Sequence, residues 1–167
     1  VTLPLLVQEF TDFECPACAS YHPVVKKLMS EFTDNVSYQF INYPLQSIHH
    51  DAYQAALAGE AAKKQNKFSE YSDLLFINQS KLQRESLISF AKEVGMDAVK
   101  FIAEMDSSDV KAKVDADIKS GETLGINATP TFYINGEKVV FVEGTNPEQT
   151  LKDLITQKLA LGKSQIK

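Results

Sequence analysis

The stretch Cys15-Pro16-Ala17-Cys18 joins an apolar segment to a segment with helical spacing, and it holds both cysteines of this 167-residue chain. Pro16 suits the first position of a helix, where its missing N–H would be unpaired anyway. Backbone N–H groups and the helix dipole at such a position favour the thiolate, which is the reactive form of cysteine. The loop that a Cys15–Cys18 disulfide would close is too small to stabilise a large fold. We therefore interpret the two cysteines as a reactive dithiol rather than as a structural disulfide.

Composition limits the class of protein. The chain is 44% hydrophobic and 23% charged, which is ordinary for a soluble globule, and its length fits one domain with room for a subdomain. The net charge is -5, from 17 basic and 22 acidic residues, and the chain has no run rich in Lys or Arg. This balance argues against a nucleic-acid partner. No apolar stretch is long enough to span a membrane.

The first part of the chain predicts a strand, a helix and a second strand. Leu3–Phe13 is apolar and rich in residues that favour strands. The helix is expected to begin at Cys15 or Pro16. The second strand, Val36–Tyr43, alternates in character and is stopped by Pro44.

The middle of the chain, from Asp51 to about Leu124, has almost no strand character. Helical periodicity and capping residues predict five short helices with brief polar joints. They are expected at Asp51–Gln65, Phe68–Ile77, Glu85–Val94, Asp97–Met105 and from Ser108 or Asp109 to Leu124.

Strand character returns at Thr131–Ile134, and Asn135-Gly136 is a strong signal for a two-residue hairpin turn. Lys138–Val142 is the predicted returning strand, and a last helix is expected from Pro147 to about Leu161. The order of elements predicts an α/β fold with a four-stranded mixed sheet flanked by helices. We predict a main domain of residues 1–47 and 125–167 and an inserted helical subdomain of residues 48–124.

Three features of the chain together resemble the thioredoxin superfamily, and within it the bacterial DsbA-like thiol-disulfide oxidoreductases. These are Cys15-Pro16-Ala17-Cys18 after the first strand, the inserted helices, and Gly125-Ile126-Asn127-Ala128-Thr129-Pro130-Thr131-Phe132 before the hairpin. A C-x-x-C motif alone also occurs in zinc sites. Its combination with the distant Thr-Pro and the Asn-Gly turn is far more specific, and the resemblance covers essentially the whole chain.

The resemblance implies a thioredoxin-like fold and a role for each motif. Cys15 would be the exposed nucleophile and Cys18 the buried resolving thiol. The Thr129–Pro130 bond would be cis and lie beside the sulfurs, leaving Thr129 free to pair with an extended substrate segment. The alternative is a trans Pro130 that simply starts a strand.

Glu9 is the next candidate, since it lies six residues before Cys15 in an apolar strand. The superfamily often has a buried acid at this place. Buried below the dithiol, Glu9 would have a raised pKa and could relay the proton of Cys18. The alternative is a Glu that reaches solvent from the strand edge. Glu14, next to Cys15, is expected to face solvent.

Pro16 and Ala17 are expected to tune the redox potential of the dithiol. Many DsbA-like proteins carry His at the second middle position, where a positive charge stabilises the thiolate. Ala17 offers only its backbone, so we expect a less oxidising protein than the members with His.

His22 raises the possibility of a metal, because Cys15, Cys18 and His22 fall on roughly one helix face. Seven residues advance about 10 Å along a helix, which is too far for Cys15 and His22 to share a zinc ion with bonds of about 2.0–2.3 Å. We therefore predict no metal site. Phe13 and Tyr43, near predicted strand ends, are candidates to flank a groove for polypeptide.

Taken together, the sequence predicts a thiol-disulfide oxidoreductase that acts on cysteines of exported proteins, with oxidation the favoured direction. The Cys15–Cys18 disulfide itself would carry the electrons, so no organic cofactor is implied. Expected partners are unfolded or cysteine-containing proteins and a membrane redox protein, and the chain is expected to be a monomer. Family resemblance places it outside the cytoplasm, in a bacterial periplasm or cell envelope, with a signal peptide removed. A reductase or isomerase of the same family, and a non-catalytic peptide-binding module, are the alternatives.

Overall fold

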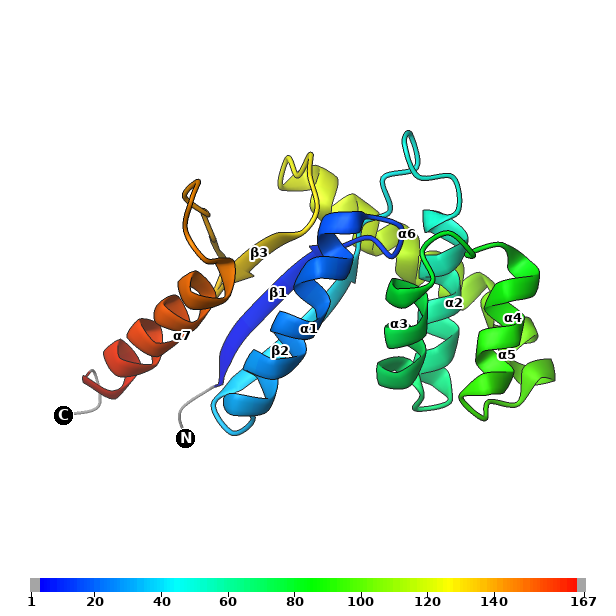
Figure 1. Cartoon of the computed structure of the whole chain (residues 1–167), viewed down its shortest axis with the longest axis horizontal. Helices are drawn as coiled ribbons and strands as arrows, with labels where there is room; N and C mark the ends of the chain where they lie inside the picture. The colour runs from blue at the N-terminus through cyan, green and yellow to red at the C-terminus, as the bar shows by residue number, and fades with distance from the viewer. Residues whose placement is uncertain (1–3, 165–167) are drawn as a thin grey trace.

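The computed structural model of the chain describes residues 4–164 and is built around a four-stranded sheet (Figure 1). The strand order is β2-β1-β3-β4; β1 pairs parallel with β2 and antiparallel with β3, and β4 pairs antiparallel with β3. The predicted mixed four-stranded sheet is therefore confirmed. Leu3, where the first strand was expected to begin, lies outside the described residues. The strands are β1 (Leu5–Thr11), β2 (Val36–Asn42), β3 (Thr131–Ile134) and β4 (Glu137–Lys138).

The central strand β1 is apolar because it has neighbours on both edges and helices on both faces. Side chains alternate along a strand, so Leu5, Val7, Glu9 and Thr11 share one face and Phe10 lies on the other. Glu9 pairs in register with Phe40 of β2 and with Phe132 of β3. The one acidic residue of β1 is thus held in the middle of the sheet.

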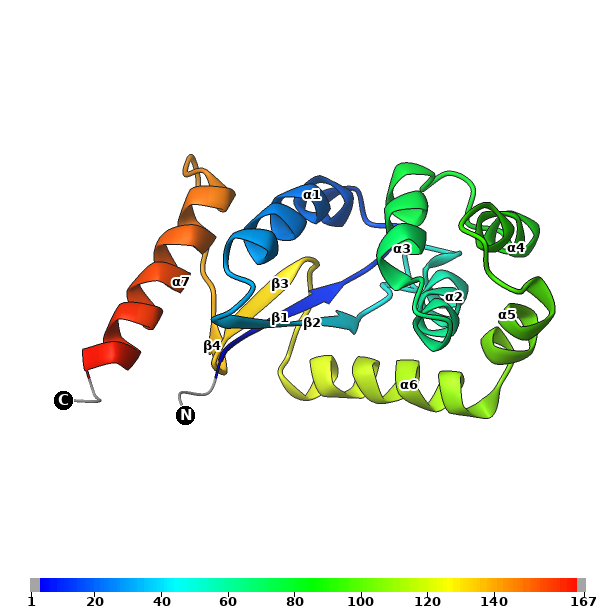
Figure 2. The ribbon, with the colours of Figure 1, turned by 90° about the horizontal axis from the view of Figure 1, so that it is seen from below.

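Helices α1 (Pro16–Glu31) and α7 (Pro147–Ser164) lie on one side of the sheet, as Figure 2 shows. Val25 and Leu28 of α1 and Leu151 and Ile155 of α7 recur at helical spacing, which directs them to one face. This core layer between the helices and the sheet comprises Leu5, Val7, Val25, Leu28, Phe132, Ile134, Val139, Leu151 and Ile155.

Five helices follow β2 and pack mainly on one another at one end of the sheet (Figure 2). The helix α2 is the centre of this group, and its alanines Ala55, Ala58 and Ala61 are fully buried. Small side chains let α3, α5 and α6 approach α2 closely, while α6 also runs beside β2. The division of the chain into two domains stays a prediction. The helices are α2 (Ala52–Lys64), α3 (Phe68–Ile77), α4 (Arg84–Glu93), α5 (Ala98–Met105) and α6 (Ser108–Thr123).

The returning strand of the hairpin is much shorter than predicted. The turn residues Asn135 and Gly136 have φ values of 47° and 81°, as the Asn-Gly signal indicates. However, β4 ends at Lys138 instead of extending to Val142. The chain leaves the ladder because Phe141 turns onto Phe132 and Tyr21, with ring centroids 6.0 and 5.7 Å apart.

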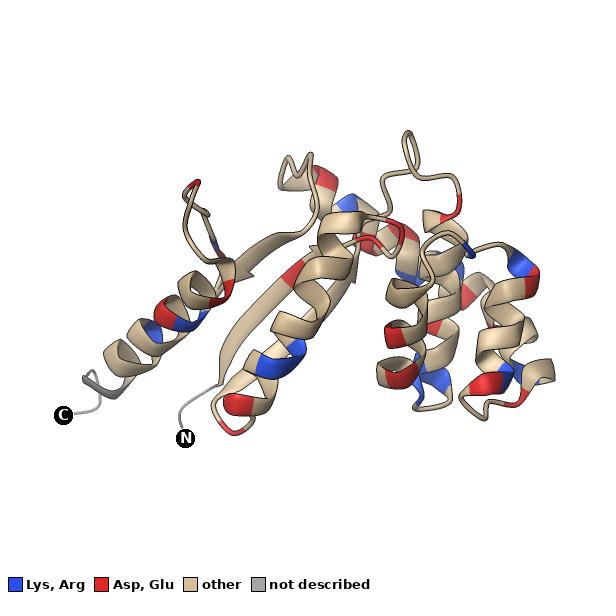
Figure 3. Ribbon diagram, in the orientation of Figure 1, with Lys and Arg blue, Asp and Glu red and all other residues tan. Residues whose placement is uncertain are grey.

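Acidic and basic residues are intermixed over the molecule rather than gathered by sign (Figure 3). Within residues 4–164, no helix combines the length and the apolar character that a membrane span requires.

Candidate active site

The loop after β1 delivers Cys15 to the start of α1. Cys15 is the N-cap residue, with extended φ and ψ of −77° and 121°, and Pro16 occupies the first helical position. Both cysteines are free thiols in this structure. The placement follows from local sequence, since proline fixes φ for a helix start and leaves no N–H unpaired.

Cys15 carries the ionised sulfur of the pair. The pKa of Cys15 is lowered from 9.0 to about 5, chiefly by a hydrogen bond from the Cys18 thiol, although burial acts in the opposite direction. Smaller contributions in the same direction come from the Thr129 hydroxyl and from the N–H groups of Cys18 and Ala17. The sequence indicated the backbone groups as the main cause, whereas the Cys18 thiol contributes more.

Cys15 is less exposed than the resemblance implied, with 6% of its surface accessible. Its Sγ lies 3.5 Å from the carbonyl oxygen of Thr129, a hydrogen bond that Cys15 donates only while it is protonated. The expectation of an exposed nucleophile is therefore wrong for this structure, because the Thr129–Pro130 segment covers one side of the sulfur. The Thr129–Pro130 peptide bond is cis, the isomer that the resemblance implies.

Cys18 is fully buried, and its pKa is raised. The larger cause is the hydrogen bond with Cys15, which keeps the proton on Cys18, and burial adds to it. The hydroxyls of Thr11 and Thr129 and the N–H of Asp12 act against this rise. Proton and charge are thus divided unequally between two sulfurs one helical turn apart.

Glu9 is buried in the sheet, with 3% of its surface exposed. Burial raises the pKa of its carboxyl from 4.5 to about 7, and a hydrogen bond from Tyr38 opposes the rise. The Tyr38 hydroxyl donates to Glu9 Oε1 over 2.5 Å. A carboxyl with a pKa near neutrality can both accept and release a proton under ordinary conditions.

Tyr38 was not identified as a site residue from the sequence. The predicted alternation of β2 places Tyr38 and Phe40 on one face, but it does not show that this face meets Glu9. That contact depends on the parallel register between β1 and β2, in which Val7 lies opposite Tyr38.

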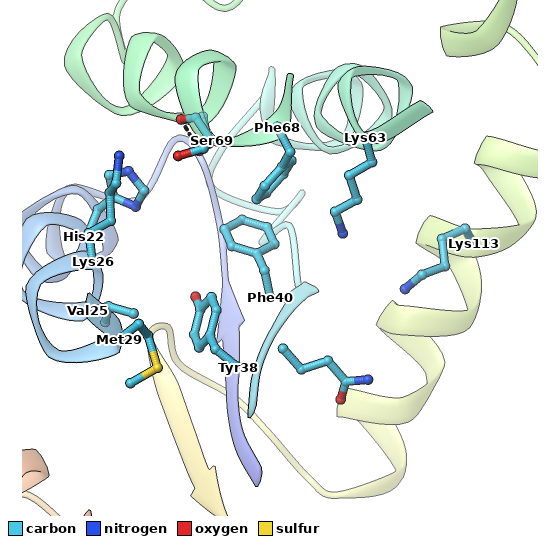
Figure 4. Close-up of a pocket in the computed structure, with 12 residues that line it drawn as sticks. His22, Val25, Lys26, Met29, Tyr38, Phe40, Lys63, Phe68, Ser69 and Lys113 are labelled. Carbon is cyan, nitrogen blue, oxygen red and sulfur yellow. Dashed lines mark hydrogen bonds between the residues drawn. The ribbon is translucent and has the colours of Figure 1, made fainter. Parts of the chain in front are cut away.

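The Tyr38 ring also lines a cleft of about 490 Å³ beside the sheet (Figure 4). The cleft has an aromatic floor of Tyr38, Phe40 and Phe68, and Lys63 of α2 and Lys113 of α6 extend toward it on the side away from α1. Neither cysteine is among its lining residues. The partner of Glu9 therefore connects the buried carboxyl to a cleft separate from the dithiol.

Asp12, which the sequence analysis overlooked, anchors the loop before Cys15. Its carboxylate accepts hydrogen bonds from the N–H groups of Glu14 and Leu45, over 2.8 and 2.9 Å, and lies 2.7 Å from His49 Nδ1. The hydrogen bond from the Glu14 N–H to Asp12, two residues earlier, forms an Asx turn. Asp favours such turns, so its place just before the cysteine motif could have indicated this one. Gln79 secures the same loop from the other side by donating to the Cys15 carbonyl oxygen over 2.8 Å.

Three further expectations are corrected by the structure. Phe13 is 1% exposed and stacks on Phe40 in the core, with centroids 5.2 Å apart. Tyr43 is also buried, and its hydroxyl donates to the Ile126 carbonyl oxygen. Neither ring flanks an open groove. Glu14 is half-buried rather than facing solvent, because its carboxylate accepts the N–H of Asp51 at the start of α2.

His22 is engaged away from the dithiol. Its Nε2 lies 2.6 Å from Asp73 Oδ1, and its ring packs against Phe76. Within the described part of the chain, no three His, Cys, Asp or Glu side chains come together in a way that could hold a metal ion.

A mixed sheet of this order, with a dithiol at the start of its first helix and a cis-proline beside it, defines a protein of the thioredoxin fold. A family model described as Thioredoxin matches residues 4–157. The chain therefore belongs to this thioredoxin family.

Solved structures agree with this assignment. A thioredoxin-like oxidoreductase from Silicibacter pomeroyi DSS-3 is 26% identical, with a TM-score of 0.80 over 93% of this chain and 87% of that one. BdbD from Bacillus subtilis is 24% identical, with a TM-score of 0.77 over 94% of this chain and 88% of its own. The oxidoreductase DsbA from Xylella fastidiosa is 20% identical and shares the fold, with a TM-score of 0.78 over 94% and 87%. The predicted resemblance to DsbA-like proteins is confirmed at the level of the fold.

Curated relatives match in sequence over a small part of their length. The Na(+)/H(+) antiporter NhaA of Herminiimonas arsenicoxydans is 38% identical over 136 residues, and NhaA 1 of Salinispora arenicola (strain CNS-205) is 33% identical over 135. These matches cover 81% of this chain, which spans about a fifth of the length of each relative.

Proposed function

We propose that the protein is a thiol-disulfide oxidoreductase that exchanges disulfides with cysteines of exported proteins through Cys15 and Cys18. The observation that carries the proposal is the dithiol at the start of α1, with Cys15 as the N-cap residue and Cys18 fully buried one turn later. In this arrangement the pKa of Cys15 is displaced downward and that of Cys18 upward. One sulfur is thereby ready to attack or be attacked at neutral pH, and the other holds its proton until it is needed.

The exchange begins when a substrate thiolate attacks Cys15 Sγ of the oxidised protein. The Cys15–Cys18 bond breaks, and the electron pair leaves on Cys18, which takes up a proton from Glu9. A second substrate thiolate then attacks the substrate sulfur of the mixed disulfide and releases Cys15 as a thiolate. Two electrons pass from the substrate dithiol to the protein disulfide, so the step needs no organic cofactor.

Oxidation is the favoured direction, because the low pKa of Cys15 stabilises the reduced protein and makes its disulfide a better oxidant. Such a protein needs a compartment where disulfides persist, so we place it outside the cytoplasm, in a periplasm or cell envelope. A membrane redox protein would reoxidise it. A reductase or isomerase remains the alternative, since Ala17 supplies no charge to the thiolate.

The test is the oxidation of reduced, unfolded ribonuclease A by the oxidised protein, with thiols counted on both partners. The expected result is that each disulfide gained by the substrate matches one lost from Cys15–Cys18. Cys15→Ser is expected to abolish transfer. Cys18→Ser cannot hold the internal disulfide, so it is offered ribonuclease A with its disulfides scrambled; its Cys15 thiolate is expected to attack one of them, release one substrate thiolate and accumulate as a mixed disulfide. Full function of Cys15→Ser would instead establish a non-catalytic peptide-binding module.

A further inference from the structure

Two buried side-chain oxygens within residues 4–164 lack a hydrogen bond of ordinary geometry, and both adjoin the dithiol. They are Thr11 Oγ1 and Thr129 Oγ1. An unpaired buried polar atom is costly, and in native proteins it commonly marks a functional site. Thr11 is the more enclosed residue, with 1% of its surface exposed.

Thr11 is the last residue of β1 and shares a sheet face with Glu9, two residues earlier. Its hydroxyl lies close enough to the Cys18 sulfur to lower the pKa of that thiol. The N–H of Asp12, the next residue, acts on the same sulfur. The end of β1 therefore directs a side-chain donor and a backbone donor at Cys18.

We propose that the Thr11 hydroxyl is a catalytic group that donates a hydrogen bond to the Cys18 thiolate while Cys15 is bonded to a substrate sulfur. In the resting dithiol, Cys18 keeps its proton and Cys15 carries the charge, so the Thr11 hydroxyl has no thiolate at Cys18 to which it could donate. When Cys15 becomes bonded to substrate, Cys18 leaves as a thiolate and carries the negative charge until Glu9 protonates it. A hydroxyl can rotate to donate to a thiolate, and hydrogen bonds to charged groups are the stronger ones.

The inference rests on the proposed function and applies to both directions of exchange. In the forward step, Cys18 is the leaving group of the broken Cys15–Cys18 bond, and a leaving thiol of lower pKa departs faster. In the reverse step, the Cys18 thiolate attacks Cys15 Sγ and expels the substrate sulfur as a thiolate. Thr11 forms no covalent bond in either step.

The first experiment measures the ionisation of Cys18 alone, in a Cys15→Ala background, from the ultraviolet absorbance of the thiolate against pH. Thr11→Val keeps the shape of the side chain and removes its donor, so it is expected to raise the pKa of Cys18 by about one unit. Thr11→Ser retains the hydroxyl and is expected to restore most of the shift. Thr150→Val removes a hydroxyl that donates to the carbonyl oxygen of Asn146, the residue before α7; it is the matched control and is expected to leave this pKa unchanged.

A second experiment follows the reduction of the oxidised wild-type dithiol by dithiothreitol. Thr11→Val is expected to slow the first exchange step by about tenfold. One unit in the pKa of the leaving thiol is worth this factor when the whole of its charge develops on Cys18 in the transition state. An unchanged pKa of Cys18 in Thr11→Val, with disulfide exchange intact, would overturn this inference and leave the proposed function standing. Conversely, a shifted pKa in a protein that transfers no disulfides would overturn the proposed function and, with it, the catalytic role of Thr11.

Discussion

At the scale of single residues, one hydrogen bond decides which sulfur is charged. Cys18 donates to Cys15, and this contact lowers the Cys15 pKa more than any other interaction. The helix start alone would favour ionisation of the first cysteine only modestly, because dipole effects are small and fall off within one turn. The dithiol therefore acts as a pair, and removal of either sulfur changes the other.

We expect Cys15 to titrate with a pKa of about 5. Its alkylation by iodoacetamide should therefore rise with pH around this value and be nearly constant from pH 6.5 upward, roughly 1.5 units higher. Cys18→Ala removes the largest contribution, so the midpoint should move upward toward 9.0, the ordinary value for a thiol. Mass spectrometry of the alkylated protein measures both midpoints. An equal midpoint in the two proteins would show that the backbone, rather than Cys18, ionises Cys15.

A second prediction concerns Ala17, which is exposed at the first turn of α1. Ala17→His places an imidazole beside Cys15, and its protonated form would stabilise the thiolate and hence the reduced protein. The dithiol should become more oxidising, by on the order of 30 mV for each tenfold change in equilibrium constant. Equilibration with glutathione buffers measures the potential. Ala17→Gln is the neutral control, and an equal shift in both variants would exclude charge as the cause.

Sequence alone identified the residues whose roles depend on local pattern. Cys15 and Cys18 follow from their spacing, and the place of Pro130 follows from the motif before the hairpin. Thr11, Asp12 and Tyr38 did not emerge, because their roles depend on contacts across the sheet and between distant loops. No window of sequence contains both Tyr38 and the Glu9 carboxyl that it contacts.

At the scale of elements, periodicity located the helices well and the last strand poorly. The predicted bounds of Phe68–Ile77 and Thr131–Ile134 are those of the structure. The apolar residues Val140 and Val142 favoured a strand, yet they are 72% and 65% exposed. Packing of the adjacent Phe141 decides the path of this segment, and strand propensity cannot anticipate such a contact.

The helix α6 should not tolerate a larger residue at Gly121. A Cβ there would lie 2.5 Å from Cε2 of Tyr43, whose hydroxyl is held by the Ile126 carbonyl oxygen. Overpacking costs about 1–3 kcal/mol, whereas replacing Gly by Ala in a helix gains about 1 kcal/mol. Gly121→Ala should therefore lower the free energy of unfolding by up to about 2 kcal/mol.

Urea denaturation measures this change, and Gly162→Ala provides the matched control. A Cβ at Gly162 in α7 would meet nothing within 4 Å, so that substitution should be neutral or slightly stabilising. If Gly121→Ala were as stable as the control, the close packing of α6 on Tyr43 would be refuted.

At the scale of the whole molecule, the sheet, α1 and the helices after β2 together enclose Glu9. Its strand neighbours Phe40 and Phe132 are both buried, and Tyr38 lies between the carboxyl and the cleft of Figure 4. A carboxyl kept in such a place is stable only when it is protonated or hydrogen-bonded. The free energy of unfolding should therefore change with pH as the Glu9 carboxyl, the proton donor in the proposed exchange, ionises.

The sign of this dependence follows from the pKa of Glu9, which is about 7 in the folded protein against an ordinary 4.5. Below pH 4.5 the carboxyl is protonated in both the folded and unfolded states, so folding incurs no penalty from its ionisation. Between these two values the unfolded state loses the proton and the folded state retains it, so stability falls as pH rises to about 7. The shift of about 2.5 units corresponds to a loss of about 3 kcal/mol at higher pH.

Glu9→Gln removes this ionisation and keeps an acceptor for the Tyr38 hydroxyl. In the reduced state, the variant should be up to about 3 kcal/mol more stable than the wild type at pH 8 and close to it at pH 4. Urea denaturation at the two pH values measures the difference, and groups that titrate alike in both proteins cancel. Glu70→Gln, at an exposed position of α3, should show no such change between the two pH values. A gain for Glu9→Gln that is equal at both would mean that Glu9 titrates normally and cannot exchange a proton with Cys18 near neutrality.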